Sequence, residues 1–265
     1  MPLTLALVQM AGIWEDPAAT LRKAEGYVRQ AADSGAALVC FSEQFATGWS
    51  PRSPRFSEEM GGPITGELSR LAQDYRLSIL GSFVEATPTR PRNTCVVFDR
   101  QGDPLASYAK LHLFSPTEED RNYLPGESLA IFEIQGFTFG IAICYDLRFA
   151  PVFHLYAERG VDCVIVPAAW PCRRIRHWEL LVATRALENQ IYMAGVNRTG
   201  NTPEDEYCGH SLIAKPTGTV LRKAGEEEEL ICGEIDRALI EEVREAIPVL
   251  KEFRSDLYSR LSGGG

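Results

Sequence analysis

Hydrophobic and polar positions follow two recurring patterns along this chain, one typical of buried strands and one typical of amphipathic helices. Short apolar runs predict strands, whereas apolar residues spaced three and four apart predict helices. In the first half, the patterns predict a strand over Leu3–Gln9, a helix over Pro17–Ala32, a strand over Ala37–Ser42, a helix over Ile64–Tyr75, and strands over Leu77–Glu85 and Asn93–Asp99.

The second half repeats this order of elements without repeating the sequence. It predicts a strand over Phe137–Ile143, a helix over Phe149–Arg159, a strand over Val161–Val166, a helix over Arg174–Gln190, and strands over Ile191–Val196 and Gly209–Ala214. Each half forms a sheet with helices on one face, so the two bare faces can be buried against each other. We therefore expect an α/β fold, a four-layer α-β-β-α sandwich of two β-α-β-α-β-β halves. We also expect residues 1–261 to form one domain and residues 262–265 to be a flexible tail.

The amino-acid composition argues against some classes of binding partner. The chain has 265 residues, 45% of them hydrophobic, which is enough for a sizeable core, and its formal net charge is −9. An acidic surface opposes binding to nucleic acid or to anionic lipid. Apolar runs stay well short of the roughly 20 residues that a membrane span needs. We expect a soluble, cytoplasmic protein whose partner is a small molecule.

Seven cysteines are distributed along the chain, at positions 40, 95, 144, 163, 172, 208 and 232. Their number is odd, and no two of them form a Cys-x-x-Cys pair. Such spacing predicts neither a disulfide framework nor a zinc site. Most of these cysteines are expected to be small buried side chains.

Three polar residues that could take part in catalysis lie at or near the ends of apolar strands. Glu43 ends the strand in LVCFSEQF, Lys110 interrupts the apolar stretch SYAKLHLF, and Cys144 lies where the strand in FGIAICYDLRF turns into a helix. Ligand crevices of open α/β sheets lie beyond the carboxyl ends of strands, which places at least Glu43 and Cys144 at one pocket. Taken singly, each has an ordinary interpretation: a capping or ion-paired acid, an edge-strand lysine, and a core thiol.

Together these residues form a sensible reaction centre. A carboxylate can take the proton of a thiol, and a nearby cation lowers the pKa of that thiol. The Lys110 ammonium and the backbone N–H of Tyr145 could then hold the oxyanion that develops on an attacked carbonyl. The sequence therefore favours Cys144 as a nucleophile, with Glu43 as its general base.

At these segments the sequence resembles the nitrilase superfamily of carbon–nitrogen hydrolases. The matching blocks are LVCFSEQFATGW, YAKLHLF and GIAICYDLRF, followed in family order by PAAWP, HWELL, RALENQIYMAGVNRTG and YCGHSLIAKPTG. The resemblance implies the four-layer sandwich and the catalytic set Glu43, Lys110 and Cys144. It also implies a homodimer, or a higher homo-oligomer, built through the helix after the nucleophile and the C-terminal tail. No metal or organic cofactor is expected.

The resemblance further implies a second catalytic glutamate, about seven residues before a glycine. In EEDRNYLPG this position is Glu119, before Gly126, and Glu118 is the neighbouring alternative. The expected role of this glutamate is to position Lys110 or the substrate. An ordinary acidic loop remains the alternative interpretation.

Within the superfamily the chain looks most like omega-amidase-type enzymes, which hydrolyse the terminal amide of short dicarboxylate monoamides such as 2-oxoglutaramate. Two blocks depart from related sequences, FAP in place of FPE at 149–151 and GHSL in place of GDSR at 209–212. For the substrate carboxylate we expect Arg173, ahead of Arg174 and Arg176, with Trp170 and His112 as further contacts.

Several other functions remain open at this point. The same set of residues also serves N-carbamoyl amine hydrolases and nitrilases, which rank second and third after an amidase. A non-catalytic scaffold, an acyltransferase and a glutaminase subunit are weaker alternatives.

Overall fold

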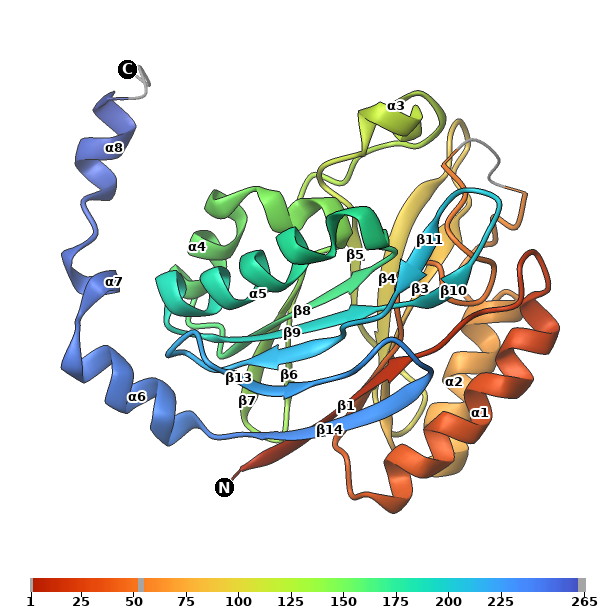
Figure 1. The fold of residues 1–265 in the computed structure, drawn as a ribbon, viewed down its shortest axis with the longest axis horizontal. Helices are drawn as coiled ribbons and strands as arrows, with labels where there is room; N and C mark the ends of the chain where they lie inside the picture. Colours follow the sequence, from red (N-terminus) through yellow and green to blue (C-terminus); the bar gives the residue numbers. More distant parts are fainter. Residues whose placement is uncertain (1, 52–54, 262–265) are drawn as a thin grey trace.

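The computed structural model describes residues 2–51 and 55–261, so the tail predicted at 262–265 lies outside the described residues. Six strands form the first sheet, in the order β14-β1-β2-β3-β4-β5. Their bounds are β1 Leu3–Gln9, β2 Leu38–Cys40, β3 Ser78–Glu85, β4 Arg92–Phe98, β5 Pro104–Ala109 and β14 Glu229–Ile235. Two helices cover its outer face (Figure 1), α1 Pro17–Asp33 and α2 Pro63–Tyr75.

The second sheet also has six strands, in the order β13-β12-β9-β8-β7-β6. Their bounds are β6 Ile131–Ile134, β7 Phe137–Ile141, β8 Cys163–Ala168, β9 Tyr192–Asn197, β12 Leu212–Ala214 and β13 Val220–Lys223. The helices α4 Ala150–Glu158 and α5 Ile175–Asn189 lie on its outer face (Figure 1).

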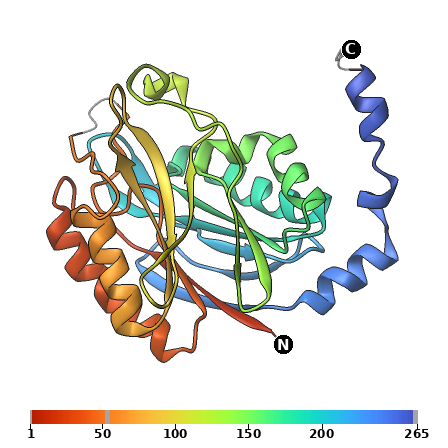
Figure 2. The same ribbon diagram turned by 180° about the vertical axis from the view of Figure 1, so that it is seen from behind.

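Three buried hydrophobic clusters correspond to the three interfaces between the layers. The central cluster joins the two sheets, with Leu5 and Leu80 from the first packed with Ile141 and Ile165 from the second. A second cluster lies between the first sheet and α1 and α2, and a third lies between the second sheet and α4 and α5. Figure 2 shows the same layers from behind. The four-layer α-β-β-α sandwich expected from the sequence is confirmed.

Helix starts follow local chemistry. The Asp16 side chain caps α1 by accepting a 2.9 Å hydrogen bond from the Ala19 N–H, and Pro17 occupies the first turn. A capping carboxylate satisfies an N–H group that has no partner within the helix, and proline there removes another.

The main departures from the predicted order lie in short strands and at the C-terminal end. The structure adds β5, β6, β13 and β14, and the hairpin of β10 Thr199–Asn201 and β11 Glu206–Cys208. Strand β14 pairs antiparallel with β1 of the first sheet, so the chain returns from the second half to the first. This return supports our proposal of one domain over residues 1–261.

Three further helices follow β14 and form a C-terminal arm. They are α6 Arg237–Ala246, α7 Val249–Glu252 and α8 Ser255–Leu261. In Figures 1 and 2 the arm extends away from the sandwich past the side that carries α4. Phe253 contacts His154 of α4, with ring centroids 3.7 Å apart.

Candidate active site

The residues singled out in the sequence converge where strands end. Glu43 follows β2 by three residues, Lys110 directly follows β5, and Cys144 follows β7 by three residues. β2 runs parallel to β3, and β5 is two antiparallel steps from β3, so β2 and β5 end at the same edge of their sheet. The architecture therefore brings together side chains that are far apart in the sequence.

Lys110 lies between two carboxylates. Its Nζ is 2.8 Å from Oε1 of Glu43 and 2.9 Å from Oε2 of Glu119, and all three side chains are at most 1% exposed. Burial lowers the pKa of the Lys110 ammonium, but the Glu119 and Glu43 carboxylates outweigh burial and raise this pKa well above its usual value. Lys110 is therefore a fixed positive charge.

Each carboxylate is also held by neutral donors. The Nδ2 of Asn93 donates to Oε1 of Glu43 at 2.7 Å and to Oε1 of Glu119 at 3.1 Å. The Ala169 N–H donates to the second oxygen of Glu43 at 2.9 Å, and the Phe114 N–H donates to Oε2 of Glu119 at 2.7 Å. Buried charges are costly unless they are paired and hydrogen-bonded, and this network meets both conditions.

The structure distinguishes the two neighbouring glutamates. Glu119 begins α3, Glu119–Asn122, and its side chain points inward to Lys110. Glu118 instead pairs with Arg121, and its side chain is 46% exposed. Of the two, Glu119 is the one at the position that the family resemblance implied for the second glutamate.

Cys144 begins a tight turn at the end of its strand, the 3₁₀ helix η2, Cys144–Arg148. Its φ of 44° lies in the left-handed region, which costs energy for a residue with a Cβ and is often found at functional sites. The N–H of the next residue, Tyr145, belongs to the first turn, where N–H groups have no partner within the helix. The thiol and this N–H therefore lie side by side.

Asp146 fixes this turn, and sequence reasoning missed it. The buried carboxylate accepts hydrogen bonds from the Ile143 N–H at 2.9 Å and the Tyr108 hydroxyl at 2.7 Å on one oxygen. The other oxygen accepts from the His112 N–H at 2.8 Å. An acid directly after an apolar strand was the available signal, the same one that drew attention to Glu43.

The thiol of Cys144 is protonated at rest. Burial raises the pKa of this thiol well above its ordinary value, and the neighbouring Glu43 carboxylate raises it further, whereas Lys110 lowers it. The sequence predicted only the effect of the cation. Burial and the carboxylate prevail, so the resting pair is a neutral thiol beside a carboxylate that can accept its proton.

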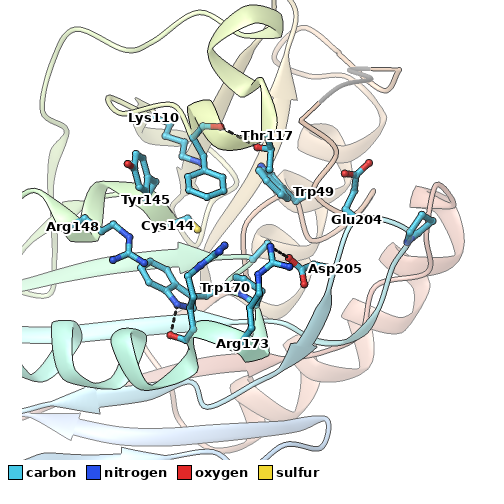
Figure 3. A pocket seen from close by; sticks show the side chains of 15 residues that line it. Trp49, Lys110, Thr117, Cys144, Tyr145, Arg148, Trp170, Arg173, Glu204 and Asp205 are labelled. Carbon is cyan, nitrogen blue, oxygen red and sulfur yellow. Dashed lines mark hydrogen bonds and ion pairs between the residues drawn. The ribbon is translucent and has the colours of Figure 1, made fainter.

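A cavity of about 230 Å³ opens above the thiol. Figure 3 shows Cys144 near its centre, with Lys110 and Tyr145 on one side and Trp170 and Arg173 on the other. Trp170 therefore lines the pocket. His112 is not among the lining residues, because its ring stacks on Phe149, with centroids 3.6 Å apart, and its Nδ1 lies 2.8 Å from Asp146. The expected substrate contact of His112 is therefore replaced by a contact with the turn.

Three arginines line the mouth of the pocket, and each makes different contacts. Arg173, preferred from the sequence, already pairs with Asp205 at 2.7 Å, and its side chain is 60% exposed. Arg148 stacks over the Trp170 ring at 4.7 Å. Arg174 lies over the Phe114 ring at 5.3 Å, and within the described ranges no carboxylate lies at ion-pair distance from it. Arg176 is not among the lining residues.

Arg174 is partly buried and lies beside the positive charge of Arg173. Burial lowers the pKa of the Arg174 guanidinium, and the positive charge of Arg173 lowers it further, whereas the Asp205 carboxylate acts in the opposite direction. Arg173, preferred from the sequence, lines the same pocket, and its guanidinium is already paired with Asp205.

The expectation of no disulfide is wrong for one pair of cysteines. Cys172 and Cys208 are bonded, with their Cα atoms 5.3 Å apart. Cys40, Cys95 and Cys163 are buried in the core, and Cys232 is half-buried. The pairing joins positions 36 residues apart, which spacing along the chain did not reveal.

Over the residues that the structure describes, no helix is long and apolar enough to cross a membrane. In the same residues, no group of three or more His, Cys, Asp or Glu side chains is arranged to hold a metal ion.

Comparisons with known proteins agree with this geometry. Residues 4–245 match the model of the carbon-nitrogen hydrolase family. The chain is 34% identical over 272 residues to human omega-amidase NIT2, covering 97% of this chain and 96% of that protein. It is 32% identical over 260 residues to the 2-oxoglutaramate amidase of Bacillus subtilis, covering 97% and 100%.

Solved structures give the same picture. Nit3 of Saccharomyces cerevisiae, a member of branch 10 of the nitrilase superfamily, superposes with a TM-score of 0.88 at 30% identity, covering 96% of this chain and 97% of that one. A mutant amidase of Nesterenkonia sp. AN1, with acrylamide added to its active-site cysteine, superposes with a TM-score of 0.89 at 26% identity, covering 98% and 99%.

Proposed function

This chain belongs to the carbon–nitrogen hydrolase family, and on that premise we propose that it is an amidase for short dicarboxylate monoamides. One observation carries the proposal: one small pocket joins the Cys144 thiol at its floor to the guanidinium of Arg174 at its mouth, and no carboxylate of the described residues lies at ion-pair distance from that guanidinium. The similar omega-amidase and 2-oxoglutaramate amidase support this substrate class, in which a terminal amide and a carboxylate occupy opposite ends of one molecule.

In the first half-reaction, Glu43 takes the proton of the Cys144 thiol while the sulfur attacks the amide carbonyl carbon. The carbonyl oxygen becomes an oxyanion, which the Lys110 ammonium and the Tyr145 N–H stabilise. Losing one such donor typically costs about 3–4 kcal/mol of transition-state stabilisation. The tetrahedral intermediate collapses, the C–N bond breaks, and Glu43 returns its proton to the leaving ammonia.

In the second half-reaction, Glu43 takes a proton from a water molecule, and the resulting hydroxide attacks the thioester carbon. The same donors hold the second oxyanion, the C–S bond breaks, and the thiolate recovers the proton from Glu43. The product is a carboxylic acid, which ionises. Glu119 is a positioning residue in both steps, because its contact at 2.9 Å fixes the Lys110 ammonium beside the reacting carbon.

We propose Arg174 as the partner of the substrate carboxylate, with Trp170 as a wall of the pocket. The experiment measures ammonia release from 2-oxoglutaramate and from the neutral amide propionamide. Arg174→Ala should lower kcat/KM for the acid by about 10- to 100-fold, since a charge-assisted hydrogen bond contributes roughly 1.5–3 kcal/mol. The kcat/KM for propionamide should change by less than about twofold, because propionamide has no carboxylate to contact Arg174.

The matched control is Arg176→Ala, which removes an exposed arginine that does not line the pocket. It should leave both substrates unaffected. An equal loss on the acid and the neutral amide in Arg174→Ala would contradict the proposed carboxylate contact. If the enzyme turned over N-carbamoyl amines or nitriles faster than both amides, the proposed substrate class would be wrong.

We further propose that the protein is a cytoplasmic homodimer built on α4 and the C-terminal arm. Support comes from apolar side chains that α4 and the arm expose, Leu155, Val249, Phe253 and Leu261. Five free cysteines fit a reducing compartment. Light scattering should give a dimer mass for the native chain and a monomer mass for Leu155→Lys; equal masses would contradict this interface.

A further inference from the structure

Asn93 of β4 is a fully buried neutral side chain that contacts both carboxylates beneath the pocket. Its backbone carbonyl accepts a 2.9 Å hydrogen bond from the N–H of Lys110. Strands β4 and β5 pair antiparallel, and Lys110 directly follows β5, so Asn93 and Lys110 are neighbours at the paired ends of these strands.

Asn93 and Lys110 bridge the same two carboxylate oxygens. The Nδ2 of Asn93 lies 2.7 Å from Oε1 of Glu43 and 3.1 Å from Oε1 of Glu119. The Nζ of Lys110 lies 2.8 Å from the same oxygen of Glu43 and 3.1 Å from the same oxygen of Glu119. The four groups therefore form a closed ring in which donors and acceptors alternate.

The orientation of the Asn93 amide follows from this ring. Only the NH₂ group of the amide can donate, so it must face the two carboxylates, and both of its hydrogens are used. The carbonyl oxygen Oδ1 accepts a 3.4 Å hydrogen bond from the Ser82 hydroxyl. The opposite orientation would place Oδ1 against two carboxylates, so the surroundings fix the amide in one state.

The ring makes the two oxygens of Glu43 unequal. Oε1 accepts from both Asn93 and Lys110, which occupies its two lone pairs. Oε2 accepts a 2.9 Å hydrogen bond from the Ala169 N–H, which leaves its second lone pair for another donor.

The donor next to Oε2 is the thiol of Cys144. Burial and the charge of Glu43 raise the pKa of this thiol, and a hydrogen bond with Glu43 raises it as well. A hydrogen bond with the Ala169 backbone lowers the same pKa. Ala169 therefore contacts both Oε2 and the sulfur, which indicates that Oε2 is the oxygen of Glu43 that faces the thiol.

We propose that Asn93 is a positioning residue that keeps Oε2 of Glu43 as the atom of proton transfer. The inference rests on the proposed function and deepens it. As the C–S bond forms, Oε2 takes the proton of the Cys144 thiol. As the C–N bond breaks, Oε2 gives this proton to the departing nitrogen, which leaves as ammonia. Without Asn93, Oε1 regains a lone pair, and the proton can bind to the oxygen on the far side from the sulfur.

The experiment compares the native enzyme with Asn93→Ala on two propionyl substrates, propionamide and p-nitrophenyl propionate. The kcat/KM covers the steps up to release of the first product. In these steps the amide needs two proton transfers through Oε2, whereas the ester needs one, because nitrophenolate leaves without a proton. General acid–base catalysis contributes about 10²- to 10⁴-fold, and the variant weakens it without removing the carboxylate. The kcat/KM should therefore fall by about 100-fold for the amide and about tenfold for the ester.

Control variants separate the orientation of the carboxylate from a loss of packing. Ser82→Ala removes only the long hydrogen bond to Oδ1 and should change both kcat/KM values by less than about twofold. Asn189→Ala removes a buried asparagine of α5 that donates to the Arg185 carbonyl. It should lower stability to denaturant and leave the ratio of the two kcat/KM values unchanged. Asn93→Ser keeps one donor hydrogen, should also lower the amide-to-ester ratio, and provides the test if Asn93→Ala does not fold.

The results that overturn the inference are distinct from those that overturn the proposed function. Equal losses on the amide and the ester in the Asn93 variants would indicate a general distortion of the site and reject the inference. Unchanged kcat/KM values would reject it as well, and so would an equal shift of the ratio in Asn189→Ala. The propionyl group has no carboxylate, so this experiment does not depend on Arg174. The proposed function fails separately, if Arg174→Ala affects acid and neutral amides alike.

Discussion

The floor and the mouth of the pocket are built on different principles. At the floor, Lys110, Glu43 and Glu119 are buried, and strand ends and loops hold each with short hydrogen bonds. At the mouth, Arg173 is mostly exposed, and a single ion pair together with a nearby disulfide restrains its surroundings. The charges of the floor are buried and hydrogen-bonded, whereas the Arg173 ion pair at the mouth is largely exposed.

This difference assigns chemistry and specificity to separate parts of the molecule. Attack on a carbonyl needs donors in fixed positions, since preorganisation is the source of oxyanion stabilisation. Selection of a substrate needs only that charge and wall position at the far end match the ligand. Changes at the floor should therefore act on kcat and stability, and changes at the mouth on KM.

The largest effect is expected from removing the charge at the centre of the floor. Lys110→Met leaves Glu43 and Glu119 buried without their cation, which should lower the free energy of unfolding by about 3–5 kcal/mol. It also removes an oxyanion donor, so kcat should fall by about 10²- to 10³-fold. Denaturant unfolding and ammonia release measure the two effects.

A surface lysine provides the control for this change. Lys223 pairs with Glu179 and is substantially exposed. Lys223→Met should cost at most about 1 kcal/mol and leave kcat unchanged. Equal effects of the two substitutions would mean that the floor is no more dependent on its charges than the surface is.

A smaller effect is expected at the turn that presents the nucleophile. Asp146→Asn replaces one acceptor oxygen by an NH₂ group that faces donors, and should cost about 1–3 kcal/mol of stability. The same change loosens the Cys144 turn, so kcat should fall by about tenfold while KM stays within about twofold. Steady-state kinetics with 2-oxoglutaramate check this separation.

Asp162 offers a matched comparison for Asp146. It is also a buried acid, and it accepts a 2.9 Å bond from the Thr138 N–H, but it lies on the opposite side of the second sheet's strands from the pocket lining. Asp162→Asn should reduce stability and leave kcat unchanged. A kcat loss of the same size in Asp162→Asn would show that the Asp146 effect comes from stability alone.

The smallest expected effect is a shift in the pH profile of thiol alkylation. Burial and the Glu43 carboxylate raise the pKa of Cys144, so its reaction with iodoacetamide should keep accelerating beyond about pH 9, where a free thiol begins to level off. Glu43→Gln removes a negative charge and should move the profile to lower pH. A plateau below about pH 8 in the native enzyme would contradict the neutral resting thiol.

Much of the fold and part of the candidate site could be predicted from the sequence, and particular residues show why. Buried strands such as Val161–Val166 are continuous apolar runs, and Glu43 and Cys144 stand out because they follow such runs directly. These local patterns were sufficient to predict the sandwich and to single out Glu43, Lys110 and Cys144. Glu119 needed the family resemblance, since EEDR alone reads as an acidic loop.

The remaining features depend on contacts between distant residues. Strand β14 pairs with β1 across more than 200 residues, and its partner cannot be inferred from its own pattern. Arg173 and Arg174 are neighbours, yet the 3₁₀ turn directs one toward Asp205 and the other over Phe114. The Cys172–Cys208 bond likewise follows from the tertiary fold, which spacing does not encode.

The central claim is that a thioester on Cys144 is shared by every substrate, and partitioning with hydroxylamine tests it most directly. Hydroxylamine competes with water for an acyl-enzyme and yields a hydroxamate. The amide and the methyl ester of one acyl group should give the same ratio of hydroxamate to acid, and Cys144→Ser should abolish both products. A ratio that depends on the leaving group, or hydroxamate formed undiminished by Cys144→Ser, would contradict the account.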